Sequence, residues 1–282
     1  MINFPYQIAR AEAWLTRTLY QTRLPRIVSR QIVSSRNIDL DVFAYSGETA
    51  LPEQIASIRA FLRYAGRPNR FVVVSDGTYT PRSIELLQRV DPVVEVRPCP
   101  QPPPELSVEK LRVYLSTHPT GKQLALIMSL PMNRPALYVD SDVLFFPGAR
   151  DLTVQITNRG APAYYLPDCE FSGDTRLLRS AAEKQQPVNT GALLLFDKLD
   201  WSLSIERFLQ LDADPIFFTN QTMTHLTMHA NAARPLDSGK YVLRRDDEFM
   251  YRDLYAGNAV ALRHYVTPVR HKFWTRLARR HG

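Results

Sequence analysis

Two aspartates stand two residues apart in a mostly apolar stretch, PALYVDSDVLFFPG at residues 135–148. In a regular strand, Asp140 and Asp142 would point to the same face. Burying two unpaired carboxylates is costly, so we expect them at a strand end that faces solvent, a cation or basic side chains. Carboxylate oxygens suit Mg²⁺ or Mn²⁺, ions that keep coordination positions open for phosphate oxygens. The alternative is structural, with Asp140 capping a turn and Asp142 solvated.

Strands and helices must alternate to place this pair at a sheet edge. The apolar patterning predicts strands at 39–45, 71–75, 93–96, 136–139, 162–166 and 191–196. Helical spacing and proline-containing first turns predict helices at 51–65, 81–90, 107–117, 121–130, 202–211 and 219–230. We interpret the proline-rich segment 98–104 as an extended loop. The alternation predicts an α/β fold with a mostly parallel sheet flanked by helices, followed by a smaller, mixed C-terminal part.

The composition excludes several classes of protein. The 282 residues are 45% hydrophobic and 22% charged, as in soluble globular proteins, so disorder is not the expected state. No apolar run approaches the ~18 residues that a membrane helix needs. The start, MINFPYQIARAEAW, lacks an apolar signal core, and we expect a cytoplasmic protein. Cys99 and Cys169 are too few for a zinc cluster, and we expect packing thiols.

The net charge of +7 is concentrated at the two ends of the chain. Residues 1–36 carry six Arg and one Glu, and residues 263–282 carry six Lys or Arg and no acid, which leaves −4 for the middle. A helix predicted at 7–21 places Ile8, Ala11, Leu15 and Leu19 on one stripe. These features favour peripheral contact with the anionic inner face of a membrane. The alternatives are a solvated basic surface and a stripe that packs onto the domain.

Further motifs lie in order before and after Asp140-Ser141-Asp142. They are Phe43-Ala44-Tyr45-Ser46, Ser75-Asp76-Gly77, Lys122 at the start of a helix, Asn189-Thr190-Gly191 before ALLLF, Asn220-Gln221 at the start of a helix, and His264-Tyr265 opening RHYVTPVRHKFW. In this order, over residues 39–274, they resemble the GT-A fold glycosyltransferases. The resemblance is closest to glycosyltransferase family 8, which includes glycogenin and bacterial lipopolysaccharide glycosyltransferases. Asn220 stands where that family has an acid, and the last motif is two residues longer.

The resemblance implies metal-dependent transfer of a sugar from a nucleotide-diphosphate sugar, with UDP favoured, to a saccharide or lipid-linked hydroxyl acceptor. It implies retention of the anomeric configuration. The organisation would be a basic helical segment at 1–36 and a GT-A domain at 37–282. Within the domain, a nucleotide-binding half covers about 37–150, an acceptor-binding half about 151–262, and a C-terminal clamp 263–282. No specific nucleic acid partner is expected.

The resemblance also implies roles for individual residues. Mn²⁺ or Mg²⁺ would be held by Asp140, Asp142 and His264. The donor would contact Tyr45, Ser46, Asp76, Lys122, Asp140, Ser141, Asn189, Gly191 and Lys272. Gln221, with Asn220 beside it, would lie near the reacting face of the sugar. Asp168, in LPDCE, is our candidate for acceptor contact, with a loop-capping role as the alternative.

Two other functions are compatible with parts of the sequence. A haloacid-dehalogenase-like phosphatase also places Asp-x-Asp after a strand, and Asp246-Asp247 could supply its later acidic pair. That motif normally opens its domain, whereas here about five predicted elements precede it. A non-enzymatic polyanion-binding protein would use the basic termini. It would leave the Asp-x-Asp and Asn-x-Gly segments without a purpose.

Overall fold

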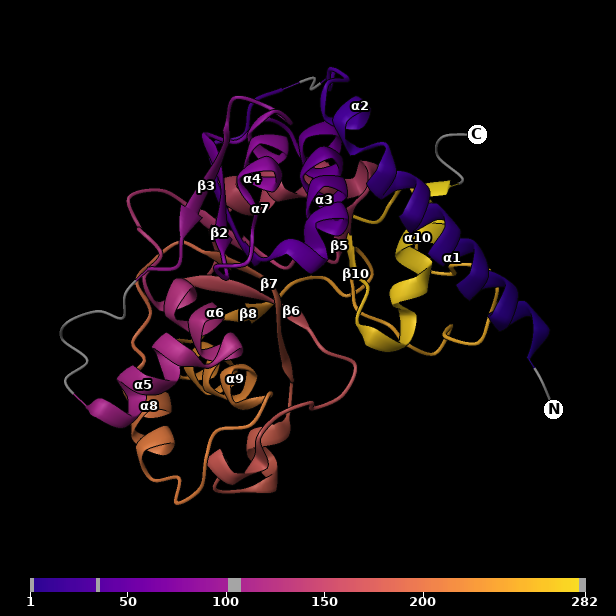
Figure 1. Cartoon of the computed structure of the whole chain (residues 1–282). Helices are drawn as coiled ribbons and strands as arrows, with labels where there is room; N and C mark the ends of the chain where they lie inside the picture. The colour runs from indigo at the N-terminus through magenta and orange to yellow at the C-terminus, as the bar shows by residue number, and fades with distance from the viewer. Residues whose placement is uncertain (1–2, 34–35, 101–107, 279–282) are drawn as a thin grey trace.

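The computed structural model describes residues 3–33, 36–100 and 108–278. Over these residues, the main sheet has seven strands in the order β3-β2-β1-β4-β7-β6-β8 (Figure 1). Its strands are β1 (Asp41–Ser46), β2 (Arg70–Ser75), β3 (Val94–Pro98), β4 (Ala136–Val139), β6 (Ala163–Pro167), β7 (Val188–Leu195) and β8 (Arg234–Pro235). The first four pair in parallel, and β7 is antiparallel to both β4 and β6. The mostly parallel α/β sheet is therefore confirmed.

Alternating side chains of the central strands pack into two apolar cores, one on each face of the sheet. In β4, Leu137 and Val139 belong to one core, and Ala136 and Tyr138 to the other. The first face is covered by α3 (Leu51–Tyr64) and α4 (Pro81–Gln88). The second is covered by α5 (Glu109–Thr117), α6 (Pro119–Met128), α8 (Ser202–Leu209) and α9 (Thr219–Ala230), on the other side in Figure 1. The three layers hold the carboxyl ends of β1, β2 and β4 at one edge.

A small second sheet follows directly from the Asp-x-Asp turn. It pairs β5 (Val143–Phe145), β10 (Leu262–His264) and β9 (Tyr241–Val242) in the order β5-β10-β9. The helix α7 (Asp151–Thr157) follows β5. The predictions from sequence missed β5, β9, β10 and α7 because these elements are short, and pairing with distant segments decides their conformation.

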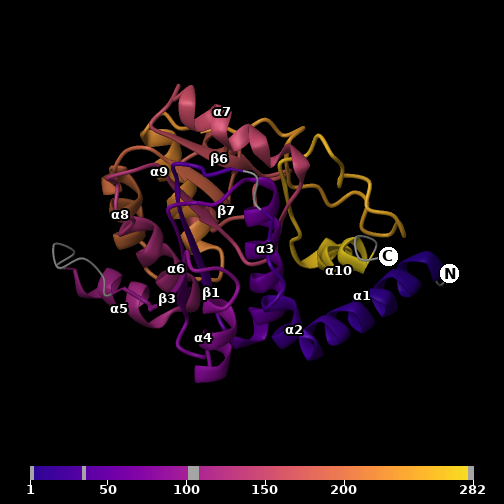
Figure 2. The ribbon, with the colours of Figure 1, turned by 90° about the horizontal axis from the view of Figure 1, so that it is seen from above.

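The two ends of the described chain pack together. The helix α1 (Phe4–Thr22) lies beside α10 (Arg270–Ala278) at one edge of the molecule in both views (Figures 1 and 2), and α2 (Leu24–Val28) links α1 to the body. The indole of Trp274 in α10 donates to Glu53 of α3 over 3.0 Å and is buried. None of the helices in the described ranges is long and apolar enough to span a membrane.

Most other predicted elements agree with the structure within a few residues. The strand at 136–139 and the helix at 219–230 agree at both ends, and α1 is three residues longer at its start than the predicted helix. Within the predicted proline-rich loop at 98–104, residues 101–104 lie outside the described residues. The division of the chain into a basic segment at 1–36 and a domain at 37–282 remains a prediction.

Candidate functional site

Asp140 and Asp142 lie at the carboxyl end of β4, and the tertiary structure adds His264. One ligand atom from each of the three residues lies within 4.8 Å of the other two. His264 arrives because β10 pairs antiparallel with β5, which places it opposite Val143, the neighbour of Asp142. Its Nε2 lies 3.0 Å from Asp142 Oδ1 and 3.7 Å from Asp140 Oδ2. Two carboxylates and an imidazole form a donor set that fits Mn²⁺ or Mg²⁺.

The orientation of the His264 ring follows from its hydrogen bonds. Asn189 Nδ2 donates to Asp168 Oδ2 over 2.9 Å, so Asn189 Oδ1 is turned toward the imidazole. That oxygen lies 2.9 Å from His264 Nδ1 and accepts only, so Nδ1 carries a proton. Nε2 therefore faces the carboxylates and, in a neutral ring, offers its lone pair to a cation.

Burial and neighbouring charges shift the pKa values of the three groups in different directions. Burial raises the pKa of Asp140 to about 6, and the nearby Asp142 adds to this rise against the opposing effect of His264. Burial acts the same way on Asp142, but His264 and Arg270 outweigh it and lower its pKa to about 2. Burial alone would lower the pKa of His264, yet Asp142 and Asp140 raise it. A cation must compete with a proton here.

Asp140 is held by two residues that our sequence predictions missed. Its Oδ1 accepts from the hydroxyl of Tyr138 over 2.7 Å and from Gln123 Nε2 over 2.9 Å. Gln123 in turn accepts from Asn220 Nδ2 over 2.8 Å, so Asn220 acts on Asp140 through Gln123. Strand alternation could have identified Tyr138, which lies two residues before Asp140 on the same face. Gln123 follows the predicted Lys122 but carried no signal of its own.

Gln221, predicted at the reacting face of the sugar, lies close to Asp168, the candidate for acceptor contact. Gln221 Nε2 donates to the carbonyl of Ser172 over 2.6 Å and lies 3.5 Å from Asp168 Oδ2. Because Asp168 also binds Asn189, a continuous chain of polar contacts runs from Gln221 through Asp168 and Asn189 to His264. This chain of contacts links residues as far apart in sequence as Asp168 and His264, which are 96 positions apart.

Gly191 has a geometric reason to be glycine. A Cβ at this position would lie 2.2 Å from His264 Nδ1 and 2.8 Å from Asn189 Oδ1. Any side chain would therefore displace the imidazole or its partner. Gly191 N donates to Asn189 Oδ1 over 2.8 Å, which fixes the amide that orients His264. The Asn-x-Gly segment thus supports the imidazole, a role that its sequence alone did not indicate.

The residues predicted to meet the nucleotide come from the ends of β1, β2 and β4 and from α6. Asp76 and Lys122 line one hollow of about 470 Å³. Tyr45 is half-buried at the end of β1, and Ser141 is half-buried in the turn between the two aspartates. The buried hydroxyl of Ser46 lies 2.9 Å from Gln54 Oε1 and 2.6 Å from the hydroxyl of Tyr79, so it is used within the fold.

Lys272 requires a correction. We expected it at the diphosphate, but its side chain is fully buried and its Nζ donates to the carbonyls of Met250 and Arg252 over 2.6 and 2.8 Å. Arg270, at the start of α10, contacts Asp142 Oδ2 over 2.5 Å and leaves about half of its side chain exposed. Two positions correspond to about 200° around a helix, so the basic residue that faces the site is Arg270.

The overall arrangement matches solved glycosyltransferase structures. The galactosyltransferase LgtC, solved with donor and acceptor sugar analogs, shares 16% identity with this chain over 85% of this chain and 95% of its own, at a TM-score of 0.53. The bifunctional glycosyltransferase WbbM shares 13% identity over 85% of this chain and 47% of its own, at a TM-score of 0.54. Mouse xyloside xylosyltransferase 1 shares 12% identity over 83% of this chain and 99% of its own, at a TM-score of 0.53. This chain has the GT-A fold.

The GT-A fold confirms the architecture that the motif order suggested. No protein-family model matches the chain, and no curated protein matches it by sequence. The likeness therefore concerns the fold. Within this GT-A fold, the group formed by Asp140, Asp142 and His264 lies at the carboxyl edge of the parallel strands, where ligands of open α/β sheets bind.

Proposed function

We propose that this protein transfers a sugar from a nucleotide-diphosphate sugar, with UDP as the nucleotide, to a hydroxyl acceptor with retention of configuration. The observation that carries this proposal is the Asp140–Asp142–His264 group at the carboxyl edge of a GT-A sheet. Its hard ligands suit a cation that leaves positions open for phosphate oxygens. A sheet edge with such a group fits an anionic nucleotide donor better than a neutral ligand.

We assign Mn²⁺ or Mg²⁺ to Asp140, Asp142 and His264. When bound, the ion would supply positive charge where the departing nucleoside diphosphate becomes negative. Arg270 is our candidate for a further cation at the phosphate oxygens, because its exposed guanidinium already binds a carboxylate of this group. Lys122 and Asp76 line the same hollow, and we assign it to the remaining phosphate and the nucleoside.

The other polar side chains suit the sugar and the acceptor. We assign Gln221 to the reacting face of the sugar, held by its bond to Ser172. The carboxylate of Asp168 lies beside Gln221 and Asn189, and we assign it to the acceptor hydroxyl. Asn220 is a positioning residue, since it reaches Asp140 only through Gln123.

The acidic pair that a haloacid-dehalogenase-like phosphatase needs does not join this group. Asp247 is fully buried in ion pairs with Arg263 and Lys272, and Asp246 accepts from the hydroxyl of Tyr255 over 2.7 Å. Among the described residues, the metal-binding candidates at this site are Asp140, Asp142 and His264. The geometry therefore favours sugar transfer over phosphate hydrolysis.

We also propose a peripheral contact between the basic N-terminal segment and an anionic membrane, with a saccharide or lipid-linked acceptor. The six arginines within residues 1–36 support it. The membrane contact and the transfer reaction are separate proposals, because the first concerns α1 and α2 and the second the carboxyl edge of the sheet.

A thermal-shift panel of nucleotide sugars, each with Mn²⁺ and with a chelator, tests the proposed donor. We expect one UDP-sugar to raise the melting temperature only with the cation present, because a ligand that binds the native state stabilises it. Release of UDP on addition of acceptors then tests transfer. Metal-independent stabilisation by every nucleotide sugar, or release of phosphate from a generic phosphate ester that Asp140→Asn abolishes, would contradict the proposal.

A further inference from the structure

One face of α1 is apolar and points away from the protein. Ala9, Ala13 and Tyr20 turn inward and are buried. Phe4, Ile8, Trp14, Leu15 and Leu19 are 69%, 57%, 69%, 52% and 42% exposed. These five residues, here called the outward face, lie within one side of the helix. The alternative in which the predicted stripe packs onto the domain is therefore contradicted, because Ile8, Ala11, Leu15 and Leu19 are all exposed.

A groove of about 830 Å³ begins where the outward face ends. Leu19 belongs to both, and α1, α2, the 30–33 segment, α3 and Leu277 of α10 form the walls. Its charged lining consists of Arg23, Arg26, Arg30, Arg59 and Arg63. Its apolar lining includes Ile27, Ile32, Val33, Ala56 and Ala60. The groove is thus both cationic and apolar.

The positive charge of this groove is not neutralised locally. No Asp or Glu is among its described lining residues, and none of its five arginines forms an ion pair with a carboxylate within the described chain. Arg59 donates to the carbonyl of Arg30 over 3.0 Å, and burial together with Arg30 and Arg63 lowers its pKa. Such mutual repulsion favours an anion between them.

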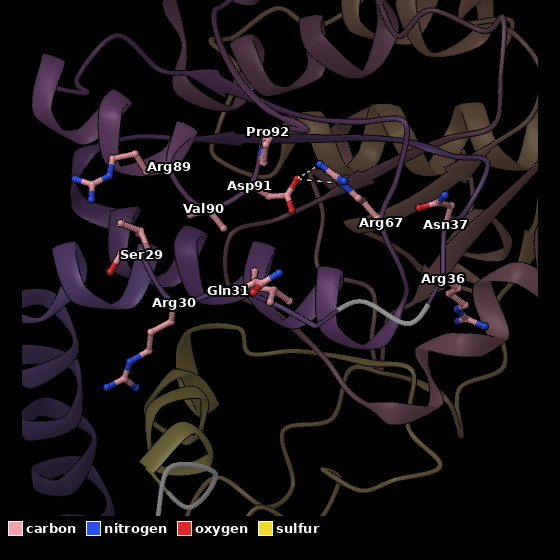
Figure 3. A pocket seen from close by; sticks show the side chains of 12 residues that line it. Ser29, Arg30, Gln31, Arg36, Asn37, Arg67, Arg89, Val90, Asp91 and Pro92 are labelled. Carbon is pink, nitrogen blue, oxygen red and sulfur yellow. Dashed lines mark hydrogen bonds and ion pairs between the residues drawn. The ribbon is translucent and has the colours of Figure 1, made fainter.

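A neighbouring hollow of about 680 Å³ lacks this character. Figure 3 shows Arg67 and Asp91 paired across it, and their closest atoms are 2.9 Å apart. Arg30 lines both hollows, but its side chain points away from the Arg67–Asp91 pair in Figure 3. The unneutralised arginines therefore gather on the side that adjoins α1.

We propose that the outward face of α1 and the arginine groove form one membrane-binding surface, in which the groove takes the phosphate of an anionic phospholipid. The inference rests on the membrane contact proposed above and not on the sugar transfer. Arginines suit phosphate oxygens, and apolar walls beside them suit the glycerol and acyl portions of a lipid. A nucleic acid would gain little from exposed leucine and isoleucine side chains.

The groove lies away from the Asp-x-Asp site. The groove contacts the second half of α3, from Ala56 to Tyr64. The first residues of α3 follow the carboxyl end of β1, where Tyr45 and Ser46 lie. The helix runs back along the sheet, so its second half lies toward the opposite edge. A bilayer at the groove would therefore not cover the carboxylates.

Vesicle co-sedimentation tests this surface with the full-length protein. The vesicles are phosphatidylcholine alone or phosphatidylcholine with phosphatidylglycerol. The groove variant replaces Arg23, Arg26, Arg30 and Arg63 by Gln, and all four are exposed. The matched control replaces Arg112, Arg134, Arg159 and Arg179, also exposed and outside the groove, by Gln, with the same change in net charge. A third variant, Ile8→Asn with Leu15→Asn, tests the outward face.

We expect binding to the anionic vesicles only, a loss of about tenfold or more in the groove and outward-face variants, and little change in the control. Trp14 provides an internal probe, because the other two tryptophans, Trp201 and Trp274, are buried. Its emission should shift to shorter wavelength on anionic vesicles. Donor-dependent thermal shifts, measured in parallel on each variant, separate a failure of this proposal from a failure of sugar transfer.

Four results would overturn the proposal. One is absence of wild-type binding to anionic vesicles, and another is equal loss in the groove and control variants, which would indicate net charge alone. A third is release of the protein from vesicles by free glycerol phosphate at the same phosphate concentration. The fourth is tighter binding to an oligonucleotide than to vesicles with the same dependence on the groove arginines.

Discussion

His264 Nε2 lies 3.0 Å from Asp142 Oδ1, although the two residues are 122 positions apart. The contact depends on the pairing of β10 with β5, which begins one residue after Asp142. The backbone reinforces it, since Tyr265 N donates to the carbonyl of Asp142 over 3.0 Å. The C-terminal segment is thus joined to the Asp-x-Asp turn by a strand ladder.

Asp142→Asn should reduce Mn²⁺-dependent donor binding by at least about a hundredfold. Loss of a residue that only supports a ligand costs 10- to 100-fold in metal affinity, so loss of a ligand should cost no less. Calorimetric titration of donor with and without Mn²⁺ measures the change. Asp246→Asn is the control, because Asp246 is an exposed carboxylate of the C-terminal region that contacts Tyr255. Undiminished binding by Asp142→Asn would exclude a ligand role.

His264→Ala should weaken Mn²⁺ binding by a similar factor while the protein stays folded. His271→Ala is the matched control, since that ring packs edge-on against Tyr6 with centroids 5.4 Å apart. Metal affinity by titration and melting by circular dichroism separate the two variants. If both lost metal affinity equally, the assignment of His264 would be wrong.

Substitution of Arg270 should affect donor binding, whereas substitution of Lys272 should affect the stability of the fold. Arg270→Gln should weaken donor binding by about tenfold, the value of a charge-assisted hydrogen bond, with little effect on stability. Lys272→Met should lower the free energy of unfolding by about 2–4 kcal/mol, because it leaves the carbonyls of Met250 and Arg252 without their donor and removes one of the two cations that pair with the buried Asp247. Urea unfolding and donor titration of both variants measure this. The reverse pattern would restore Lys272 to the diphosphate.

Gly191→Ala should abolish metal binding, because the added Cβ would lie 2.2 Å from the imidazole nitrogen. Ala192→Gly is the control at the adjacent residue of β7. The buried side chain of Ala192 points to the face of the sheet opposite Gly191, into the core under α3 and α4. That variant should lose about 1 kcal/mol of stability and keep its metal affinity. Equal metal affinity in wild type and Gly191→Ala would show that the ring has room to move.

Metal affinity should rise as the pH increases from about 5 to about 8, because Asp140 and His264 must lose their protons before they bind the cation. Asp140, with a pKa of about 6, is protonated at the acid end and ionised at the alkaline end of this range. The raised pKa of His264 acts in the same direction. Titrations of Mn²⁺ at several pH values measure the slope. In Asp140→Asn the slope should be shallower, and an unchanged slope would exclude Asp140.

The sequence by itself determined the three-layer fold and much of the site. Apolar runs such as 136–139 stop at Asp140, so strand position and strand end are both local information. Because parallel strands end at one edge, the motifs after β1, β2 and β4 had to lie near one another. The order of motifs predicted that Asp140, Asp142 and His264 act together, and their ligand atoms lie within 4.8 Å of one another.

The tertiary structure decided which basic residue faces the carboxylates and which side of α1 stays exposed. Arg270 and Lys272 look equivalent in the sequence, but the turn of α10 sends one to Asp142 and the other to a buried carboxylate. Ala9 and Ala13, small residues with no strong signal, pack inward, whereas the larger apolar stripe faces outward. Helix rotation depends on packing against distant partners, and hydrophobic spacing alone does not specify those partners.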